Sequence, residues 1–217
     1  MIKTDTMRSL ITGSILTFIS LTAIAQNDTE ALRILDNFSS VALGAPSVSM
    51  KFTMETIDQV EGTNESRSGS IIFSKDRYRL DMPDNIIWFN GETSWSYLPA
   101  EKEVTIAKPD KKDNSFMSKP SVIFSVYKKG YKVRLVEEKQ DSYLIDLYPE
   151  DINSDHIRIR LSIGKPMPDL KSIGYKYKNG VTVNLTVKEY DLKQQPGSSE
   201  FTFSPDKFKG VEIIDMR

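Results

Sequence analysis

The chain has no cysteine and a single histidine, His156, among its 217 residues. Disulfide frameworks, thiolate metal centres and cysteine nucleophiles are therefore excluded, and most histidine-based sites cannot be assembled. We expect neither a metal ion nor a cofactor, and we interpret His156 as a surface residue that opens a strand. A domain of this length can be stable on its hydrophobic core alone.

An excess of charge of one sign is also lacking, because 29 Lys and Arg residues balance 30 Asp and Glu residues. Without a basic excess, the sequence gives no reason to expect a nucleic-acid partner. The sequence also contains no GxSxG, P-loop or GxGxxG motif. Its 39% hydrophobic and 27% charged residues are typical of a globular protein. Because these catalytic motifs are missing, we expect the protein not to be an enzyme.

The only long hydrophobic run lies at the N-terminus. Basic residues precede an apolar stretch at 10–24, which ends in the small-x-small pattern AIA. This order is typical of a secretory signal peptide, and the run is too short to span a bilayer. We therefore predict a signal peptide at 1–25 that is removed after Ala25, export to the periplasm, and a single domain over 26–217. Since no cysteine follows the signal, we expect no lipid anchor on the exported chain.

Residues 27–43 carry the clearest helical pattern. Asn27 and Glu30 resemble a capping box at its start, and Gly44 supplies a stop. The apolar positions at three- and four-residue spacing are Leu32, Leu35, Phe38 and Ala42. A helix with one apolar stripe must bury that stripe against another element, so we expect it to pack on a sheet.

From residue 48 onward the hydrophobic period changes to two, which is the spacing of β-strands. The polar stretch at 62–68 is expected to be a turn, and the short apolar run at 121–129 a short helix. The remaining pattern predicts a mainly β (α+β) fold. We expect one curved antiparallel sheet of about eleven strands with the helices on its concave side.

Residues 69–99 hold both tryptophans, Trp88 and Trp95, in a series of short strands. Tyr78 and Leu80 alternate with charged neighbours, and the second tryptophan alternates with serines. At a period of two, this places apolar groups on one sheet face and polar groups on the other. The segment therefore predicts an apolar wall.

Such a wall has more than one interpretation. Most apolar residues on a sheet face are core. The crowding of aromatic side chains, with isolated Phe116 and Met117 in the polar loop at 108–120, instead favours a binding cavity. Acidic residues near the tryptophans also allow a glycosidase-type carboxylate pair: Asp81, Asp84 and Glu92. That alternative is less favoured, because acidic residues at strand ends and turns are usually solvated.

Four groups of residues, in order along the chain, resemble one known family. They are SG at 68–69 leading to KDRYRL at 75–80, NGETSWSYLP at 90–99, YKKGYK at 127–132, and FTF at 201–203 with GVEIID at 210–215. On these motifs the chain resembles the periplasmic outer-membrane lipoprotein carriers of the LolA type. The resemblance is closest to the form found in Bacteroidetes-like bacteria.

The resemblance implies a half-barrel with a short helical lid over an apolar cavity. It implies a chaperone that binds the acyl chains of lipoproteins and carries them from the inner to the outer membrane, without a cofactor. The implied partners are acylated lipoproteins, an inner-membrane lipoprotein-releasing ABC transporter and an outer-membrane acceptor. We expect a monomer.

The resemblance and the apolar wall together predict the residues that line the cavity. Lys75 and Asp76 stand where other members have an arginine–proline pair that ties the lid, so Lys75 is the expected lid latch, without the fork of an arginine. The expected lining residues are Phe52, Met54, Ile72, Tyr78, Leu80, Trp88, Trp95, Tyr97, Phe116, Met117 and Phe124.

Three other functions stay open at the level of the sequence. One is a sensor on the same fold that regulates an envelope-stress pathway. Another is a secreted hydrolase, which the missing catalytic motifs disfavour. The third is a carrier of another amphiphile, such as a glycolipid, which the sequence does not separate from a lipoprotein carrier.

Overall fold

The computed structural model describes the backbone of residues 19–109 and 119–217, and the side chains from residue 28 onward. It begins with one long helix, α1 (Ile19–Gly44). Six strands follow: β1 (Val48–Asp58), β2 (Thr63–Ser74), β3 (Arg77–Asp81), β4 (Ile86–Phe89), β5 (Ser94–Leu98) and β6 (Glu103–Ala107). The next elements are η1 (Pro120–Phe124), η2 (Val126–Lys128), β7 (Tyr131–Glu138), β8 (Ser142–Pro149), β9 (His156–Gly164), β10 (Leu170–Tyr177) and β11 (Val181–Asp191). The C-terminal segment holds η3 (Ser198–Phe201), η4 (Pro205–Lys207) and β12 (Glu212–Asp215).

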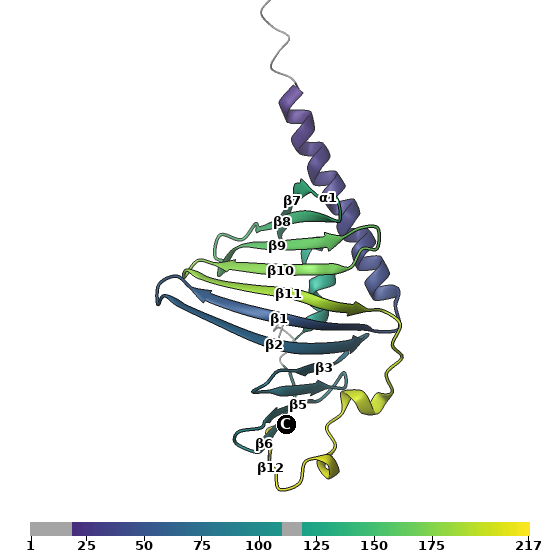
Figure 1. The fold of residues 1–217 in the computed structure, drawn as a ribbon, viewed down its shortest axis with the longest axis vertical. Coiled ribbons are helices and arrows are strands. Elements are labelled where there is room, and N and C mark those ends of the chain that lie inside the picture. The colour runs from purple at the N-terminus through teal and green to yellow at the C-terminus, as the bar shows by residue number, and fades with distance from the viewer. Residues whose placement is uncertain (1–18, 110–118) are drawn as a thin grey trace, which may run out of the picture.

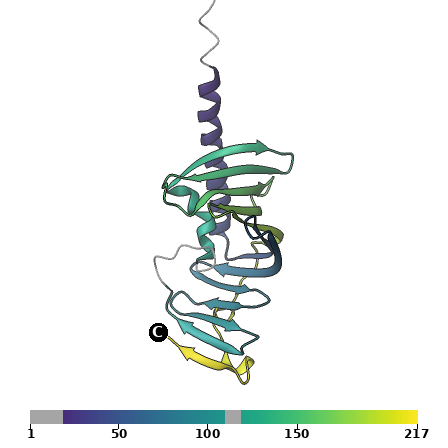
Figure 2. The same cartoon turned by 90° about the vertical axis from the view of Figure 1, so that its left-hand side faces the viewer.

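All twelve strands form one sheet, in the order β12-β6-β5-β4-β3-β2-β1-β11-β10-β9-β8-β7 (Figure 1). Neighbours pair antiparallel except β12, which runs parallel to β6. The sheet curves but does not close (Figure 2). The predicted curved antiparallel half-barrel with an N-terminal helix is confirmed, with twelve strands in place of about eleven.

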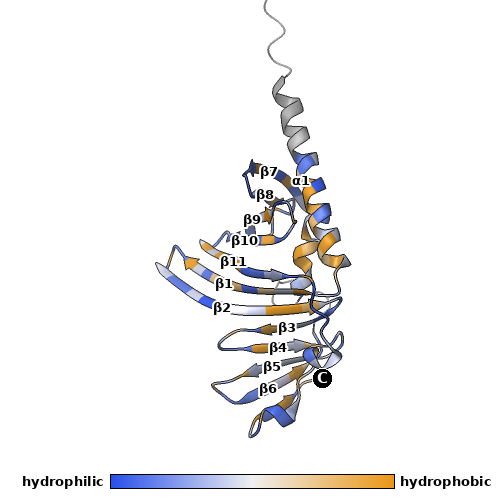
Figure 3. Ribbon diagram, turned by 45° about the vertical axis from the view of Figure 1, so that its right-hand side comes forward, coloured by the Kyte–Doolittle hydropathy of each residue, from blue (hydrophilic) through white to orange (hydrophobic). Residues whose placement is uncertain are grey.

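Strand β2 corrects the turn expected at 62–68. It begins at Thr63 and pairs with β1 from Thr63 to Phe73, so the turn is confined to the residues before it. Its first half is polar and exposed, and its second half is apolar and buried (Figure 3). The part of a hairpin that extends beyond the core is held by backbone hydrogen bonds between its two strands, so its side chains need not alternate between apolar and polar. The sequence period therefore does not reveal this part of the strand.

Helix α1 corrects two details of the expected helix. It begins at Ile19, so Asn27 lies inside it and does not cap it. Leu32 is 41% exposed, whereas Ile34 is buried. The buried stripe consists of Ala31, Ile34, Leu35, Phe38 and Ala42. Most of the expected stripe is thus confirmed, and the helix packs on the sheet through it.

The short helix expected at 121–129 is a pair of 3₁₀ turns, η1 and η2, separated at Ser125. Pro120 opens η1, where its missing N–H group costs nothing. The two turns bury Ile123, Phe124 and Tyr127. A 3₁₀ segment is tighter and less favourable than an α-helix, and it is used in short pieces.

The sheet has an inner face, which carries α1, η1 and η2, and an outer face, on which the C-terminal segment 198–211 packs. Tyr78 and Leu80 of β3 belong to the apolar cluster of the inner face. Arg79, between them, lies over the ring of Trp88 on the outer face, 5.7 Å from the ring centroid. Alternation thus separates two apolar clusters across the thickness of the sheet.

Candidate functional site

Strands β1–β3 and β7–β11 build a continuous apolar wall on the inner face. The pairing register places Met50, Ile71 and Leu80 side by side on successive strands. All three side chains are at most 1% exposed. At Gly69, Phe52 lies close over the backbone of the neighbouring strand, where a Cβ atom would be 2.9 Å from Phe52 Cζ. The wall is therefore both broad and closely packed.

Helix α1 and η1 cover one part of this wall. The ring of Phe124 lies 5.1 Å from that of Phe38 on α1 and 5.3 Å from that of Phe73 on β2. Phe124 is therefore wedged between the helix and the sheet, and it is fully buried. Aromatic pairs at these spacings add to the stability gained from burial.

A polar contact joins η2 to α1. Tyr127 donates a hydrogen bond from its hydroxyl to Asp36 Oδ1, over 2.6 Å. Burial, and then the bond to the Asp36 carboxylate, raise the pKa of Tyr127 well above its usual range. The hydroxyl thus stays protonated and donates at every physiological pH. It ties the 3₁₀ pair to the helix.

The wall continues beyond this cover towards one end of the strands. Helix α1 passes the right-hand ends of β7–β11, whereas the β1–β2 and β10–β11 hairpins extend to the left (Figure 1). Towards these hairpins the inner-face residues are half-buried and not fully enclosed. They include Met54, Tyr175 and Val183, whose strands are paired in register.

Four rings form a cluster at this open end, which we call the rim cluster: Tyr131, His156, Tyr175 and Tyr177. Tyr131 stacks on His156 with centroids 5.7 Å apart, and Tyr175 stacks on Tyr177 at 6.3 Å. A register shift in the β9–β10 pair places Tyr177 opposite His156, so that Ile157 has no partner. Burial raises the pKa of each tyrosine hydroxyl and lowers the pKa of His156. The cluster is therefore uncharged at neutral pH.

Five of the predicted lining residues meet on the inner side of the sheet. Phe52, Tyr78, Leu80 and Phe124 belong to the inner-face cluster, and Met54 packs against it. Their role in binding a ligand stays a proposal.

Four other predicted lining residues lie on the outer face. Trp88 and Trp95 face each other on β4 and β5, and Tyr97 joins the same outer cluster. Ile72 pairs with Arg79, which has the outer orientation. The expected set therefore does not form one surface. The reason is β4, which reads IIWF and is apolar towards both faces, so alternation does not tell which face is inner.

The C-terminal segment covers the outer tryptophan. Phe203 and Phe208 approach Trp88 with ring centroids 5.6 Å away in each case. Phe208 also lies 4.8 Å from the ring of Tyr97. Phe203 of the FTF motif and Val211 of the GVEIID motif thus belong to the outer cluster.

Lys75 lies in the β2–β3 hairpin turn, with a left-handed φ of 56°. Its side chain is exposed and makes no hydrogen bond or ion pair with the residues that the structure describes. In this conformation it does not join a lid to the sheet. Phe116 and Met117 lie outside the described residues.

Some inner-face residues were not singled out by the sequence. Tyr175 and Tyr131 lie on expected strands, but the β9–β10 register shift conceals the alternation that would group them with His156. Phe38 was expected on the helix, although its contact with Phe124 depends on the tertiary fold. His156, expected to be a surface residue, is half-buried between aromatic rings.

The three candidate carboxylates of a glycosidase site have different positions and partners. Asp81 forms an ion pair with Arg79 on the outer face, at 2.7 Å. Asp84, in the β3–β4 turn, forms an ion pair with Arg67 at 2.6 Å. Glu92 lies in the turn at the other end of β4. Two of the three carboxylates are therefore engaged in ion pairs with arginine side chains.

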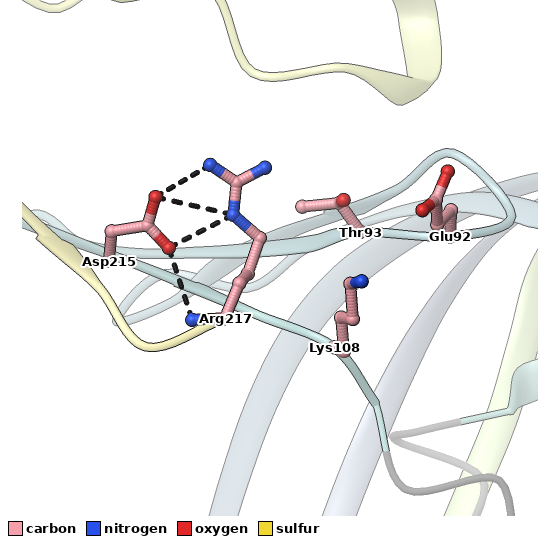
Figure 4. Close-up of a pocket in the computed structure, with 5 residues that line it drawn as sticks. All are labelled: Glu92, Thr93, Lys108, Asp215 and Arg217. Atoms are coloured by element: carbon pink, nitrogen blue, oxygen red, sulfur yellow. Dashed lines mark hydrogen bonds and ion pairs between the residues drawn. The ribbon is translucent and has the colours of Figure 1, made fainter.

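A polar pocket lies near the opposite edge of the sheet (Figure 4). Arg217 donates hydrogen bonds to Asp215 and holds its pKa at about 2. The other lining residues are Glu92, Thr93 and Lys108. No aromatic ring lines this pocket, and it does not continue the apolar wall.

Among the side chains of residues 28–109 and 119–217, no three His, Cys, Asp or Glu are grouped so that they could hold a metal ion. No helix in this part of the chain has both the length and the apolar character needed to cross a membrane.

Comparison with known proteins identifies the family of the chain. The sequence model of the family described as "Outer membrane lipoprotein carrier protein LolA" matches residues 21–163, well over half of the chain. The chain belongs to the LolA family. This is a family of binding proteins, and the predicted resemblance is confirmed.

Solved structures resemble this chain at low sequence identity. An uncharacterized conserved protein from Thermus thermophilus has a TM-score of 0.54 at 13% identity, over 86% of this chain and 99% of that chain. A putative outer membrane lipoprotein-sorting protein domain from Vibrio parahaemolyticus has a TM-score of 0.44 at 13% identity, covering 81% and 97%. A LolA superfamily protein from Nitrosomonas europaea has a TM-score of 0.42 at 11% identity, covering 80% and 97%. No curated protein matches the sequence.

Proposed function

We propose that this protein is a periplasmic carrier that binds the acyl chains of lipoproteins against the inner face of its sheet. The observation that carries the proposal is a broad apolar wall whose cover, among the residues that the structure describes, is one helix and two short 3₁₀ turns, in a chain of the LolA family. Burial of an acyl chain is worth about 0.8 kcal/mol per CH₂ group. A multiply acylated protein therefore needs such a wall to cross an aqueous compartment.

In this proposal the acyl chain displaces the elements that cover the wall, which are α1 and the 3₁₀ turns η1 and η2. Phe124 and Phe38 occupy the space against the wall that an acyl chain would take. The 3₁₀ turns that hold Phe124 are short, and the hydroxyl of Tyr127 joins them to α1 through its hydrogen bonds with Asp36 and Ser39. A hydrogen bond to a carboxylate contributes about 1.5–3 kcal/mol to stability, which is less than the burial of a long acyl chain provides. Acyl chain contacts can replace it.

The route follows from the same proposal. The chain is exported with its signal removed after Ala25, receives lipoproteins from an inner-membrane ABC transporter and delivers them to an outer-membrane acceptor. It acts as a monomer, binds without covalent chemistry and needs no cofactor. The family match supports this role.

A pair of substitutions tests the inner face as the binding surface. Met54 is half-buried on the inner side of β1, and Thr53 is half-buried on the outer side. We expect Met54→Glu to lower the affinity for an acylated lipoprotein at least tenfold, because a carboxylate on the wall opposes apolar burial. The affinity is measured by displacement of a fluorescent fatty acid.

Thr53→Glu is the matched control, since it places the same charge one residue away on the opposite face. We expect it to bind like the unmodified protein. Equal loss of affinity in both variants, or in neither, while both remain folded by circular dichroism, would count against the inner face.

A further inference from the structure

The rim cluster has the chemistry of a separate subsite at the open end of the wall. We propose that it binds the glyceryl ester group of an acylated ligand, so that the ester carbonyls accept hydrogen bonds from Tyr175 and Tyr177. This inference rests on the proposed function, because it concerns the polar end of the same ligand.

The position of the cluster supports this assignment. Tyr131 and Tyr175 pack against the inner-face apolar cluster, so the rings continue the wall without a break. Tyr175 pairs with Ile159 of β9 on one side and with Val183 of β11 on the other. An acyl chain that lies along the wall under α1 therefore has its head group at these rings.

Hydrogen bonding divides the cluster into two pairs. Tyr131 and His156 are already partnered, since the hydroxyl of Tyr131 lies 2.8 Å from His156 Nε2 and Ser154 Oγ lies 3.2 Å from His156 Nδ1. Tyr175 and Tyr177 make no hydrogen bond with the described residues. Neither hydroxyl is among the fully buried polar atoms, so both still reach solvent. With no acceptor among the described residues, they are free to donate to a ligand.

The charge of the cluster selects the class of ligand. All four side chains are neutral at physiological pH, because burial raises the pKa of the tyrosines and lowers that of the histidine. Neutral hydroxyl donors beside an apolar wall suit an ester carbonyl between acyl chains, whereas a phosphate is bound best by arginine or lysine. The diacylglyceryl group of a lipoprotein and that of a phospholipid share this chemistry.

Two ligands with the same chains test the proposal. One is a synthetic peptide that begins with S-(2,3-diacyloxypropyl)cysteine, and the other is its dialkyl ether analogue, which lacks the ester carbonyls. Each displaces a fluorescent hydrocarbon, diphenylhexatriene, from the protein. We expect the unmodified protein to bind the diester on the order of tenfold more tightly than the diether, as two hydrogen bonds would give.

Variants that lack only the hydroxyls locate the effect. We expect Tyr175→Phe with Tyr177→Phe to bind both ligands with the affinity of the diether, and each single variant to lose part of the preference. Tyr148→Phe, which removes a hydroxyl on the outer face that donates to Asp146, is the control and should keep the full preference.

The results separate the two proposals. Equal binding of diester and diether by the unmodified protein, or a preference that survives in the double variant, would overturn the subsite and leave acyl binding intact. Failure of the unmodified protein to bind either ligand would overturn both. A third arm uses diacylphosphatidylethanolamine: competition equal to that of the peptide assigns the subsite to glyceryl esters in general, and weaker competition assigns it to lipoproteins.

Discussion

At the scale of single residues, close packing on the inner wall depends on one glycine. Gly69 of β2 lies under Phe52 of β1 and Met82 after β3. Its missing side chain allows two large apolar groups to meet over the backbone. The SG pair at 68–69 was part of the family resemblance, and the structure gives a physical reason for the glycine: close approach, not a special backbone angle.

We predict that Gly69→Ala destabilises the protein by about 1–3 kcal/mol, which is the usual cost of overpacking. The added Cβ would overlap Met82 Sδ and lie 2.9 Å from Phe52 Cζ and 3.0 Å from the Asp81 carbonyl oxygen. The free energy of unfolding is measured by urea denaturation.

Gly44→Ala is the matched control. Gly44 has no atom within 4 Å of a Cβ built on it, so the same methyl group should cost little there. Equal stability of the two variants would show that Phe52 and Met82 do not pack closely against Gly69.

Residue patterns in the sequence predicted strand character better than they predicted orientation. Tyr78 and Leu80 alternate with arginines, and the structure confirms that alternation. Trp88 and Trp95 also alternate, but on the other face. Alternation shows which residues of one strand share a face. Whether that face is the inner or the outer one depends on how β3, β4 and β5 pair.

At the scale of elements, β4 and the C-terminal segment build the outer cluster, which contains both tryptophans. Strand β4 contributes Ile87 and Phe89 to the inner cluster and Ile86 and Trp88 to the outer one. The outer side is closed by Phe203 and its neighbours. The aromatic density of residues 69–99 thus serves two cores, and only one of them can belong to the proposed binding wall.

We predict that Phe203→Ala loosens the outer cluster without lowering acyl affinity. Phe203 is 6% exposed and packs on Trp88, so its removal should cost about 3–5 kcal/mol and let water reach the indole. The checks are a red shift of tryptophan fluorescence and a lowered urea midpoint. Loss of acyl affinity with unchanged fluorescence would instead place the outer cluster in the binding site.

Elements with a strong local signal were predictable, and elements that depend on tertiary context were not. The apolar stripe of α1 is visible in the sequence because its spacing is helical. The 3₁₀ form of η1 and η2 is not, because the run at 121–129 is short and its conformation depends on packing against Phe38 and Phe73. The polar half of β2 has no hydrophobic period at all.

At the scale of the whole molecule, the open curved sheet provides an apolar wall that α1 and the 3₁₀ turns cover in part. A closed barrel would enclose its ligand, whereas this sheet leaves β7 and β12 as separate edges. One end of the wall lies under α1 and η1, and the other ends at the rim cluster. The proposed carrier therefore holds acyl chains at one end and the polar head at the other.

The most direct test of the carrier function is native mass spectrometry of the protein, without residues 1–25, mixed with a purified triacylated lipoprotein. The comparison is the same lipoprotein with its acylated cysteine replaced by serine, which carries no acyl chain. The proposed function predicts a one-to-one complex with the acylated form and none with the serine form. Binding to both forms, or to neither, would contradict recognition of the acyl chains.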